Sequence, residues 1–358
     1  MSDFKVFDYM EKFEFEQVVH FYDKTTGLKG ITVIHNTQLG PSLGGTRLWN
    51  YKSEEEAEED CLRLARGMTY KAAAAGLNLG GGKTVLIGTP DLKNEAYMRA
   101  LGRFVQSLNG RYITAEDINI GTKDLGFVNM ETDHVVGLEG KSGNPSPKTA
   151  LGAFYGIKAA LKHKFGDDTI SKYTYAVQGT GQTGYYLTKL LLEHGAKKIY
   201  FTEINEKYIT RMNKEYPEVE FIKPEDYFKA NVDVLSTCAL GGLLNDETIP
   251  QIKAKIIAGT ANNILKDENV HGDMLKERGI LYAPDFVINA GGLINVAHEI
   301  RGYNEAQADA DIAKIYDRLM EIFKISDEQN IHTQKAAMIF AQNRIDQVTK
   351  VRSNYIKR

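Results

Sequence analysis

Two lysines and one carboxylate have the residue types for proton transfer beside a bound anion. Lys71 lies in the run GMTYKAAAAG, Lys83 follows three consecutive glycines, and Asp117 ends the run RYITAED. One ammonium can bind an anionic group of a ligand, and a second lysine that is partly buried beside it can lose its proton and act as a base. The alternative is that both lysines reach solvent and the glycines form a plain turn.

A helix is expected to carry Lys71. Ser53, with Glu56 three residues later, predicts a capping box at its start, and Gly76 predicts its end. The apolar residues of this segment recur at intervals of three and four and share one face, which Lys71 continues: Ala57, Cys61, Leu64 and Met68.

Lys83 is expected on a glycine-rich loop that leads into a short strand over 84–87. A phosphate-binding P-loop needs a glycine where Leu77 stands and a helix where this strand is expected, so the pattern excludes an ATPase of that class. Upstream, residues 16–37 predict two strands joined by a turn, and residues 39–47 a glycine-rich connector. A helix over 94–108 and a strand over 111–117 place Asp117 at a strand end, where α/β folds bind ligands.

A second motif follows in the other half of the chain. A strand over 173–178 leads into Gly179-Thr180-Gly181-Gln182-Thr183-Gly184, then a helix over 185–194 and a strand over 198–202. An acidic residue, Glu203, follows about twenty positions on, which completes the dinucleotide-binding fingerprint. The glycines allow a tight turn, a close approach of the pyrophosphate and close helix packing, and the helix N-terminus binds the phosphates.

Glu203 would accept hydrogen bonds from the ribose hydroxyls and repel a 2′-phosphate, and no Arg or Lys directly follows it. NAD is therefore favoured over NADP. Later strands, over 232–237, 255–258 and 281–283, end in small or amide residues that suit the carboxamide of nicotinamide, although capping of turns is an open alternative. These residues are Cys238, Ala239, Asn262 and Asn289.

The composition is that of an ordinary globular protein. The 358 residues are 42% hydrophobic and 25% charged, with a formal net charge of -3. Nucleic acid and an anionic membrane are therefore not expected partners. Two distant cysteines, Cys61 and Cys238, indicate a reducing compartment, and with no signal peptide or membrane span a cytoplasmic location is expected. The eight histidines have no metal-binding spacing, so no metal is predicted.

These motifs together resemble the glutamate/leucine/phenylalanine/valine dehydrogenases nearly from end to end. The matching runs include LGPSLGGTRLW, GMTYKAAAAGLNLGGGKT, RYITAED, GNPSPKTALG, VQGTGQTG and APDFVINAGG. The resemblance implies reversible, NAD-dependent oxidative deamination of an L-amino acid to its 2-oxo acid and ammonia. It also implies roles for Lys83 (activation of water), Lys71 (the α-carboxylate) and Asp117 (protons on the amino group). It further places Thr149, Asn262 and Asn289 around the nicotinamide.

The resemblance also bears on the substrate side chain. By resemblance, Leu43 matches a lysine of the glutamate dehydrogenases that binds the side-chain carboxylate of the substrate, and Val296 matches a serine. Substrates with apolar side chains are therefore favoured over glutamate. Leucine, with valine and isoleucine, is the expected class, and phenylalanine or tryptophan an alternative. The implied substrate-binding residues are Lys71, Gly44, Leu43, Met68, Ala115, Leu293 and Val296. Three departures from the family pattern are Glu203 in place of Asp, the run after Asp117, and a shorter connector near residue 140.

The expected architecture is two α/β domains with a cleft between them. Residues 1–140 would form a substrate-binding and oligomerisation domain, to which a helix over 333–358 returns, and residues 141–332 a Rossmann domain. The resemblance implies a homo-oligomer, a dimer or an octamer. A catalytically silent NAD-binding sensor is the non-enzyme alternative, against which the complete set Lys71, Lys83 and Asp117 argues.

Overall fold

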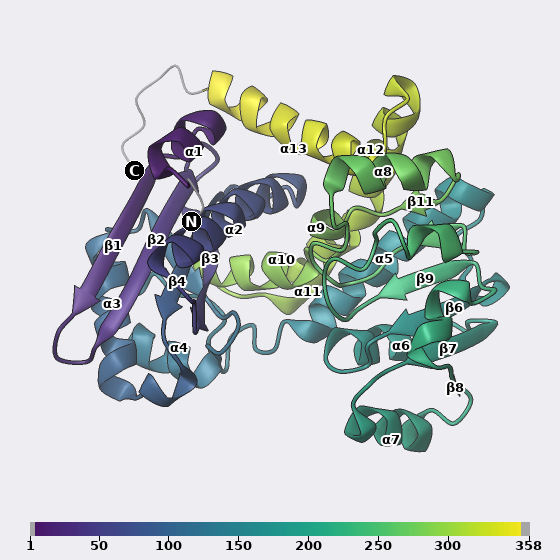
Figure 1. The fold of residues 1–358 in the computed structure, drawn as a ribbon, viewed down its shortest axis with the longest axis horizontal. Coiled ribbons are helices and arrows are strands. Elements are labelled where there is room, and N and C mark those ends of the chain that lie inside the picture. The colour runs from purple at the N-terminus through teal and green to yellow at the C-terminus, as the bar shows by residue number, and fades with distance from the viewer. Residues whose placement is uncertain (1–3, 352–358) are drawn as a thin grey trace. The chain divides into compact units, whose positions relative to one another are not determined.

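The computed structural model describes residues 4–351, and the chain divides into two compact units (Figure 1). Unit 1 comprises Met1–Asn144, Val296–Asn304 and Ala341–Arg358, and unit 2 comprises Pro145–Asn295 and Glu305–Phe340. The chain therefore passes between the units four times.

Unit 1 is built on a five-stranded mixed sheet of order β1-β2-β4-β3-β5. The first hairpin is antiparallel, β2 pairs antiparallel with β4, and β3 runs parallel to both β4 and β5. Gly27, in the left-handed region at φ 72°, closes the hairpin turn. The strands are β1 (Gln17–Asp23), β2 (Leu28–Asn36), β3 (Ser42–Trp49), β4 (Gly80–Ile87) and β5 (Tyr112–Ala115).

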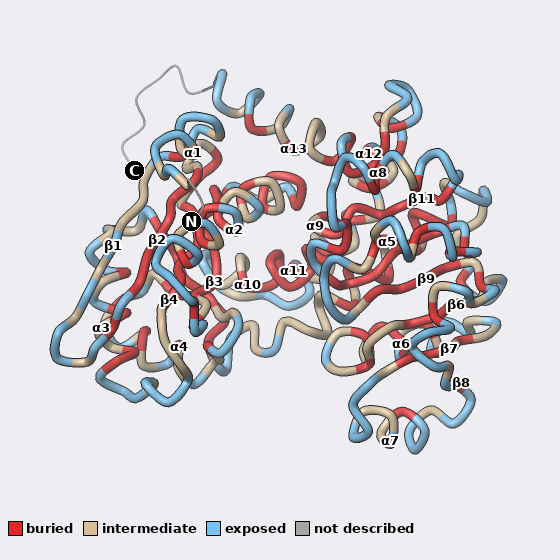
Figure 2. The backbone as a smooth tube through the Cα atoms, viewed as in Figure 1, coloured by how far each residue is buried: buried red, intermediate tan, exposed pale blue. Residues whose placement is uncertain are grey.

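Side chains alternate between the two faces along each strand, and helices bury both faces of the inner strands β2 and β4. Val33 and Val85 point to one face, where they join a core with α2, while Ile34 and Leu86 point to the opposite face and pack with α3 and α4. Figure 2 shows the buried sheet between partly exposed helices. The helices of unit 1 before the crossing are α1 (Val6–Phe13), α2 (Glu54–Ala74), η1 (Pro90–Leu92), α3 (Glu95–Ser107) and α4 (Thr122–Asn129).

Two glycine-rich segments are strands, and the predictions of a connector over 39–47 and a loop before Lys83 are wrong. A Cβ on Gly44 would lie 1.8 Å from the carbonyl oxygen of Gly82, and one on Gly81 would lie 2.1 Å from the backbone nitrogen of Thr69. The glycines therefore let β3 lie close to the backbone of β4, and let β4 lie close to the backbone of α2. Composition alone suggested turns, whereas close packing is the reason for these glycines.

Helix α2 begins after Ser53 as predicted, and the Ser53 side chain accepts a hydrogen bond from the Glu56 backbone N–H. The predicted capping box is present only in part, because the Glu56 carboxylate accepts from the Lys52 N–H at 2.7 Å rather than from that of Ser53. Its buried face differs from the predicted one, because small residues rather than Leu64 and Met68 are turned toward the sheet. Leu64, Met68 and Lys71 form a half-buried stripe at the edge of that face. The buried residues are Ala57, Cys61, Leu62, Ala65, Thr69, Ala72, Ala73 and Ala74.

Unit 2 has a six-stranded sheet of order β11-β10-β9-β6-β7-β8, in which every pairing is parallel. In chain order this is 3-2-1-4-5-6 read from β8, the order of dinucleotide-binding Rossmann sheets. The predicted α/β class with a Rossmann domain is therefore confirmed. The strands are β6 (Thr174–Gln178), β7 (Lys198–Thr202), β8 (Glu220–Phe221), β9 (Val234–Thr237), β10 (Ile256–Ile257) and β11 (Leu281–Tyr282).

Helices fill the rest of unit 2. Two helices, over 291–297 and 333–350, continue from unit 2 into unit 1, and the short helix over 298–301 belongs to unit 1. Within residues 4–351 no helix is both long and apolar enough to cross a membrane. The helices are α5 (Ser146–Phe165), η2 (Ile170–Lys172), α6 (Thr183–Glu193), α7 (Glu206–Glu215), η3 (Pro224–Lys229), η4 (Ile249–Gln251), α8 (Glu268–Glu277), α9 (Asp285–Ile288), α10 (Gly291–Ala297), η5 (His298–Arg301), α11 (Glu305–Ala313), α12 (Ile315–Gln329) and α13 (Thr333–Lys350).

Candidate active site and nucleotide site

The structure brings Lys83 and Asp117 into direct contact. Lys83 lies on β4 with only 6% of its side chain exposed, and its Nζ donates a hydrogen bond to Asp117 Oδ2 at 2.5 Å. A buried ammonium needs such a partner, because leaving it unpaired in the protein interior is costly. Asp117 follows β5, as the sequence predicted, whereas Lys83 stands inside a strand rather than on a loop.

Asp117 binds a second cation that the sequence reasoning did not single out. The Arg47 Nε donates to the same Oδ2 atom at 3.1 Å. Burial raises the pKa of Asp117, but the Lys83 ammonium and the Arg47 guanidinium outweigh it and hold the pKa below its ordinary value. Asp117 is therefore an ionised carboxylate between two cations.

The loop after Asp117 fixes its position. Asn119 adopts the left-handed conformation at φ 61° and donates from Nδ2 to the Leu48 carbonyl oxygen at 3.0 Å. The Leu48 backbone N–H in turn donates to the Ile118 carbonyl oxygen at 3.0 Å, and the Ile120 N–H donates to the Asp117 carbonyl oxygen. This run, which departs from the expected family pattern, thus forms a turn that ties Asp117 to the end of β3.

The predicted substrate-binding residues of unit 1 come from neighbouring elements. Lys71 and Met68 lie half-buried on α2, the helix that packs on β4. The β3–β5 register pairs Gly44 with Thr114 and Gly45 with Ala115, and Leu43 is buried on the same strand. Val296 is grouped with unit 1 and Leu293 with unit 2, both buried on α10.

Cys61 has a structural role. It is fully buried, and its Sγ donates weak hydrogen bonds to the carbonyl oxygens of Lys83 and Ile31, at 3.3 and 3.4 Å. Burial raises the pKa of the Cys61 thiol, so it stays protonated and unreactive. Cys61 therefore serves as a small side chain of the core.

In unit 2 the fingerprint has the predicted strand–turn–helix form. Gly179 is left-handed at φ 82°, and a Cβ on Gly184 would lie 1.8 Å from the Gly179 carbonyl oxygen, so only glycine permits this contact. Thr183 begins α6, and its Oγ1 hydrogen-bonds Thr260 Oγ1 at 2.5 Å. Thr180, Gly181 and Gln182 form the loop before α6, whose N-terminus is the predicted site of a pyrophosphate.

Glu203 is already engaged with this loop. Its Oε2 accepts from the Thr180 N–H at 2.8 Å, and its Oε1 accepts from the N–H groups of Ile204 and Asn205 at 2.9 and 3.1 Å. The longer side chain relative to aspartate thus reaches back to the fingerprint. Of the two carboxylate oxygens, Oε2 keeps a further lone pair for a ribose hydroxyl, whereas Oε1 already accepts two N–H groups.

The residues predicted around the nicotinamide leave polar atoms for it. Asn289 Nδ2 donates to Asn262 Oδ1 at 2.6 Å, while Asn289 Oδ1 is buried without a partner among the described residues. Cys238 and Ala239 follow β9 directly beside the fingerprint, where Ala239 is the nearest neighbour of Gly179. Thr149 lies on α5 against Gly292, and its Oγ1 donates to the Pro145 carbonyl oxygen. The orphaned amide oxygen and the glycine cradle fit a nicotinamide dinucleotide.

Arg211 is a further group that sequence reasoning missed. Its Nη2 donates to the carbonyl oxygens of Thr180 and Gly181, and its guanidinium stacks 4.0 Å from the centre of the Tyr185 ring. It therefore fixes the fingerprint loop from α7. The signal in the sequence is weak, because a single arginine on an exposed helix has many ordinary roles.

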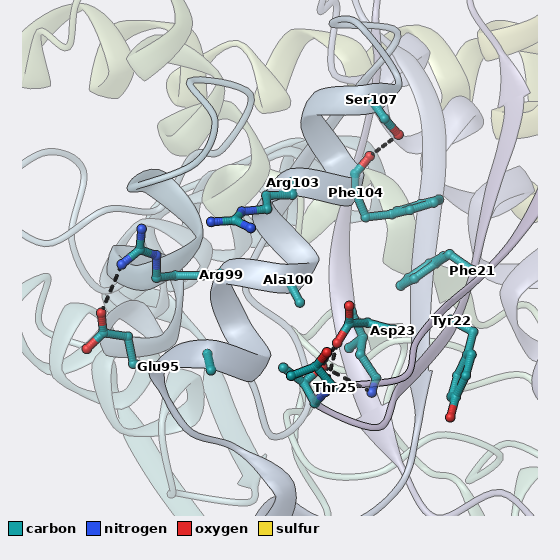
Figure 3. Close-up of a pocket in the computed structure, with 13 residues that line it drawn as sticks. Phe21, Tyr22, Asp23, Thr25, Glu95, Arg99, Ala100, Arg103, Phe104 and Ser107 are labelled. Carbon is teal, nitrogen blue, oxygen red and sulfur yellow. Dashed lines mark hydrogen bonds and ion pairs between the residues drawn. The ribbon is translucent and has the colours of Figure 1, made fainter.

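A pocket of about 840 Å³ lies elsewhere in unit 1, between the β1–β2 hairpin and α3 (Figure 3). Phe21 and Phe104 stack there, and Arg99 and Arg103 belong to its lining. None of the predicted catalytic or cofactor-binding residues lines it. Both arginines are bound to Glu131, so their charges are already compensated.

A Rossmann unit with an intact fingerprint and a second unit with a buried lysine–aspartate pair define a dinucleotide-dependent dehydrogenase. The chain belongs to the glutamate/leucine/phenylalanine/valine dehydrogenase family. The model of the family's dimerisation domain matches residues 14–134, and that of its dehydrogenase domain matches residues 199–353. The resemblance stated from the sequence is thus confirmed, and the chain is an amino-acid dehydrogenase with a nicotinamide cofactor.

Relatives with assigned activities match along almost the whole chain. The leucine dehydrogenase of Geobacillus stearothermophilus is 52% identical over 99% of this chain and 96% of its own length. The L-tryptophan dehydrogenase of Nostoc punctiforme is 44% identical over 98% of this chain and 99% of its own length. A crystal structure of L-tryptophan dehydrogenase from Nostoc punctiforme has a TM-score of 0.86 at 42% identity, covering 96% of this chain and 99% of that one.

Proposed function

We propose that this enzyme catalyses the NAD-dependent oxidative deamination of branched-chain L-amino acids, leucine first, to their 2-oxo acids and ammonia, and the reverse reaction. The observation that carries the proposal is the buried Lys83–Asp117 pair in a chain 52% identical to a leucine dehydrogenase over 99% of its length. The identity to L-tryptophan dehydrogenase is lower, at 44%.

Three side chains of unit 1 have the chemistry for the deamination. Lys71 binds the α-carboxylate of the substrate, as a point charge on the edge of α2. The α-hydrogen leaves as hydride and the substrate becomes an iminium. Lys83 then takes a proton from the water molecule that adds to the iminium carbon, and Asp117 exchanges protons with the nitrogen, which leaves as ammonia. The ionised Asp117 also stabilises the positive charge that develops on the substrate nitrogen. The bound nicotinamide supplies the hydride acceptor.

Unit 2 supplies the nucleotide site and the preference for NAD. The N–H groups at the start of α6 bind the pyrophosphate, and Glu203 accepts from the ribose hydroxyls. A 2′-phosphate at this position would meet a carboxylate whose oxygens already accept three backbone N–H groups. Repulsion between the two anions therefore favours NAD over NADP.

The substrate side chain would meet apolar groups only. Leu43, Leu293 and Val296 are all buried and offer no partner to a charged side chain. A glutamate side chain would lose its hydration without a compensating ion pair, so the site selects against it. Aromatic side chains differ from leucine only in size, which makes phenylalanine and tryptophan the second candidate class.

The test is an activity panel with each standard L-amino acid, with NAD and then NADP, following the reduced nicotinamide by absorbance. Highest kcat/KM with leucine, valine or isoleucine and NAD supports the proposal. Highest kcat/KM with phenylalanine or tryptophan would assign the second class, and no reduction with any amino acid would favour a silent NAD sensor. Replacing Lys83 by Ala should abolish turnover and leave NADH binding near that of the wild type.

We also propose that unit 1, in addition to binding the substrate, joins copies of the chain into a homo-oligomer, a dimer or an octamer. The support is the matched family model, which is that of a dimerisation domain over residues 14–134. A cytoplasmic location, as expected from the cysteines, belongs to the same proposal. Light scattering coupled to size-exclusion chromatography gives the number of subunits, and a monomer at working concentrations would contradict the oligomer.

A further inference from the structure

Arg47 binds two carboxylates at once. It lies on β3, and its guanidinium Nε donates to Asp117 Oδ2 at 3.1 Å while Nη1 donates to Asp60 Oδ2 at 2.9 Å. Tyr51 then donates its hydroxyl to the same Asp60 oxygen at 2.6 Å. The Arg47 side chain is 20% exposed and that of Asp60 14%, so these contacts are largely shielded from water.

This arrangement gives Asp117 a cation whose charge is permanent. Lys83 changes its protonation during the proposed reaction, and whenever it is neutral it no longer offsets the burial of Asp117. An isolated carboxylate in such surroundings takes up a proton. Arginine cannot lose its proton in a protein, so Arg47 compensates Asp117 in both states of Lys83.

We propose that Arg47 is a positioning residue of this enzyme, which holds Asp117 ionised and oriented while Lys83 is neutral, and that Asp60 and Tyr51 hold Arg47 in place. The inference rests on the proposed amino-acid dehydrogenase activity and adds a group that lies one contact away from the reacting atoms. Arg47 acts through Asp117 and is not itself a catalytic residue.

The guanidinium group of Arg47 has the geometry needed to bind two carboxylates at once. Two donors on different nitrogens reach Asp117 at the end of β5 and Asp60 on α2, so one side chain joins two elements. A lysine at this position has a single donor nitrogen and can hold only one of the two carboxylates well. Burial lowers the pKa of Arg47, and the carboxylates of Asp117 and Asp60 more than offset this, so that it is raised.

The charged groups that face Asp117 come from each neighbouring element. Lys83 lies on β4 and Arg47 on β3, and Glu116 precedes Asp117 in the chain. Burial, followed by the charge of Asp117, raises the pKa of Glu116. From α2, Asp60 and Arg63 act on Arg47, since Arg63 Nη2 donates to Asp60 Oδ1 at 3.2 Å. Among these groups, Lys83 and Arg47 contact Asp117 directly, and of the two Arg47 carries the permanent charge.

The decisive variants are Arg47→Gln, Arg47→Lys and Asp60→Asn, with Arg103→Gln as a matched control. Arg103 pairs with Glu131 at the surface of the same unit and touches none of these groups. Each variant is purified as the full chain. The measurements are kcat and KM with leucine and NAD across the pH range, NADH binding, and thermal unfolding.

Arg47→Gln should lower kcat about 100-fold, the cost of a misplaced catalytic group, with NADH binding unchanged. Its activity should rise at a pH about 1 unit higher than in the wild type, because Asp117 stays protonated longer. Arg47→Lys should recover part of kcat, and Asp60→Asn should shift the profile in the same direction by less. Arg103→Gln should match the wild type.

A folded Arg47→Gln variant with the kcat and pH profile of the wild type would overturn the proposal. If that variant does not fold, Arg47→Lys and Asp60→Asn decide, and wild-type pH profiles in both overturn it. A wild-type enzyme that reduces NAD with no amino acid would instead refute the proposed function, so the two failures are distinguishable.

Discussion

His35 should make unit 1 sensitive to mild acid. Its Nδ1 hydrogen-bonds Thr69 Oγ1 at 2.7 Å and its Nε2 contacts the Phe13 carbonyl oxygen at 3.1 Å, with only 4% of the residue exposed. Burial lowers the pKa of His35 from 6.5 to about 4, and the nearby Arg66 charge adds to this. The neutral ring is therefore the folded form between these two pH values.

The sign follows from proton uptake. Between pH 6.5 and about 4 the unfolded chain binds a proton at His35 and the folded chain does not, so the free energy of unfolding falls as the pH is lowered through this window. At roughly 1.4 kcal/mol per pKa unit, going from about pH 7 to about pH 5 should cost about 2 kcal/mol from this residue alone.

The assay is urea unfolding at the two pH values, followed by tryptophan fluorescence. The chain has one tryptophan, Trp49, and it lies in unit 1 together with His35, so the signal reports the relevant unit. His35→Gln keeps one hydrogen bond and should lose about 2 kcal/mol less than the wild type between the two pH values. His20→Gln, at an exposed site, is the control. Equal losses in the wild type and His35→Gln would refute the reasoning.

Three further perturbations have defined outcomes. Gly81→Ala places a methyl group 2.1 Å from the backbone nitrogen of Thr69, so α2 must move away from β4. The free energy of unfolding, measured by urea titration, should fall by about 3 kcal/mol or more, and activity should be lost. Glu203→Gln removes the charge that opposes a 2′-phosphate, so the ratio of kcat/KM with NAD to that with NADP should fall about tenfold; an unchanged ratio would contradict this role. Arg344→Ala removes the donor to the Leu77 carbonyl oxygen at 2.7 Å and the donors to its neighbours. Hydrogen exchange in residues 341–350 should therefore be faster, which corresponds to a loss of about 1–2 kcal/mol of local stability. Unchanged protection there would show that apolar contacts hold α13 instead.

The sequence predicted the elements whose signals are local. The Ser53 cap, the helix predicted over 94–108 and the fingerprint from Gly179 each depend on a few neighbouring residues, and each lies within a residue or so of its expected place. The glycines before Lys83 were wrongly predicted to form a loop. Glycine is required there because the backbone of α2 lies too close to β4 for a side chain. That contact joins distant segments and leaves no local pattern.

The site was predicted in part for the same reason. Lys83 and Asp117 were chosen for their residue types, and the structure brings them together across 34 positions of sequence. Arg47 reaches Asp117 across 70 positions, and nothing around it in the chain indicates that contact. The sequence predicted that Leu64 and Met68 lie on the buried face of α2 because they are large and apolar. The alanines of α2 are buried instead, because small side chains can pack closely on the strand glycines.

The passage of α13 between the units has a consequence for how the chain is made. Unit 1 is assembled from three separate pieces, and the last, beginning at Ala341, leaves the ribosome only after all of unit 2. Until then the carbonyl oxygens of Gly76 and Leu77, at the end of α2, have no Arg344 to bind. The first-made half of the enzyme is therefore finished last, and a chain cut at residue 340 would keep unit 2 whole while leaving the helix that carries Lys71 uncovered at its end.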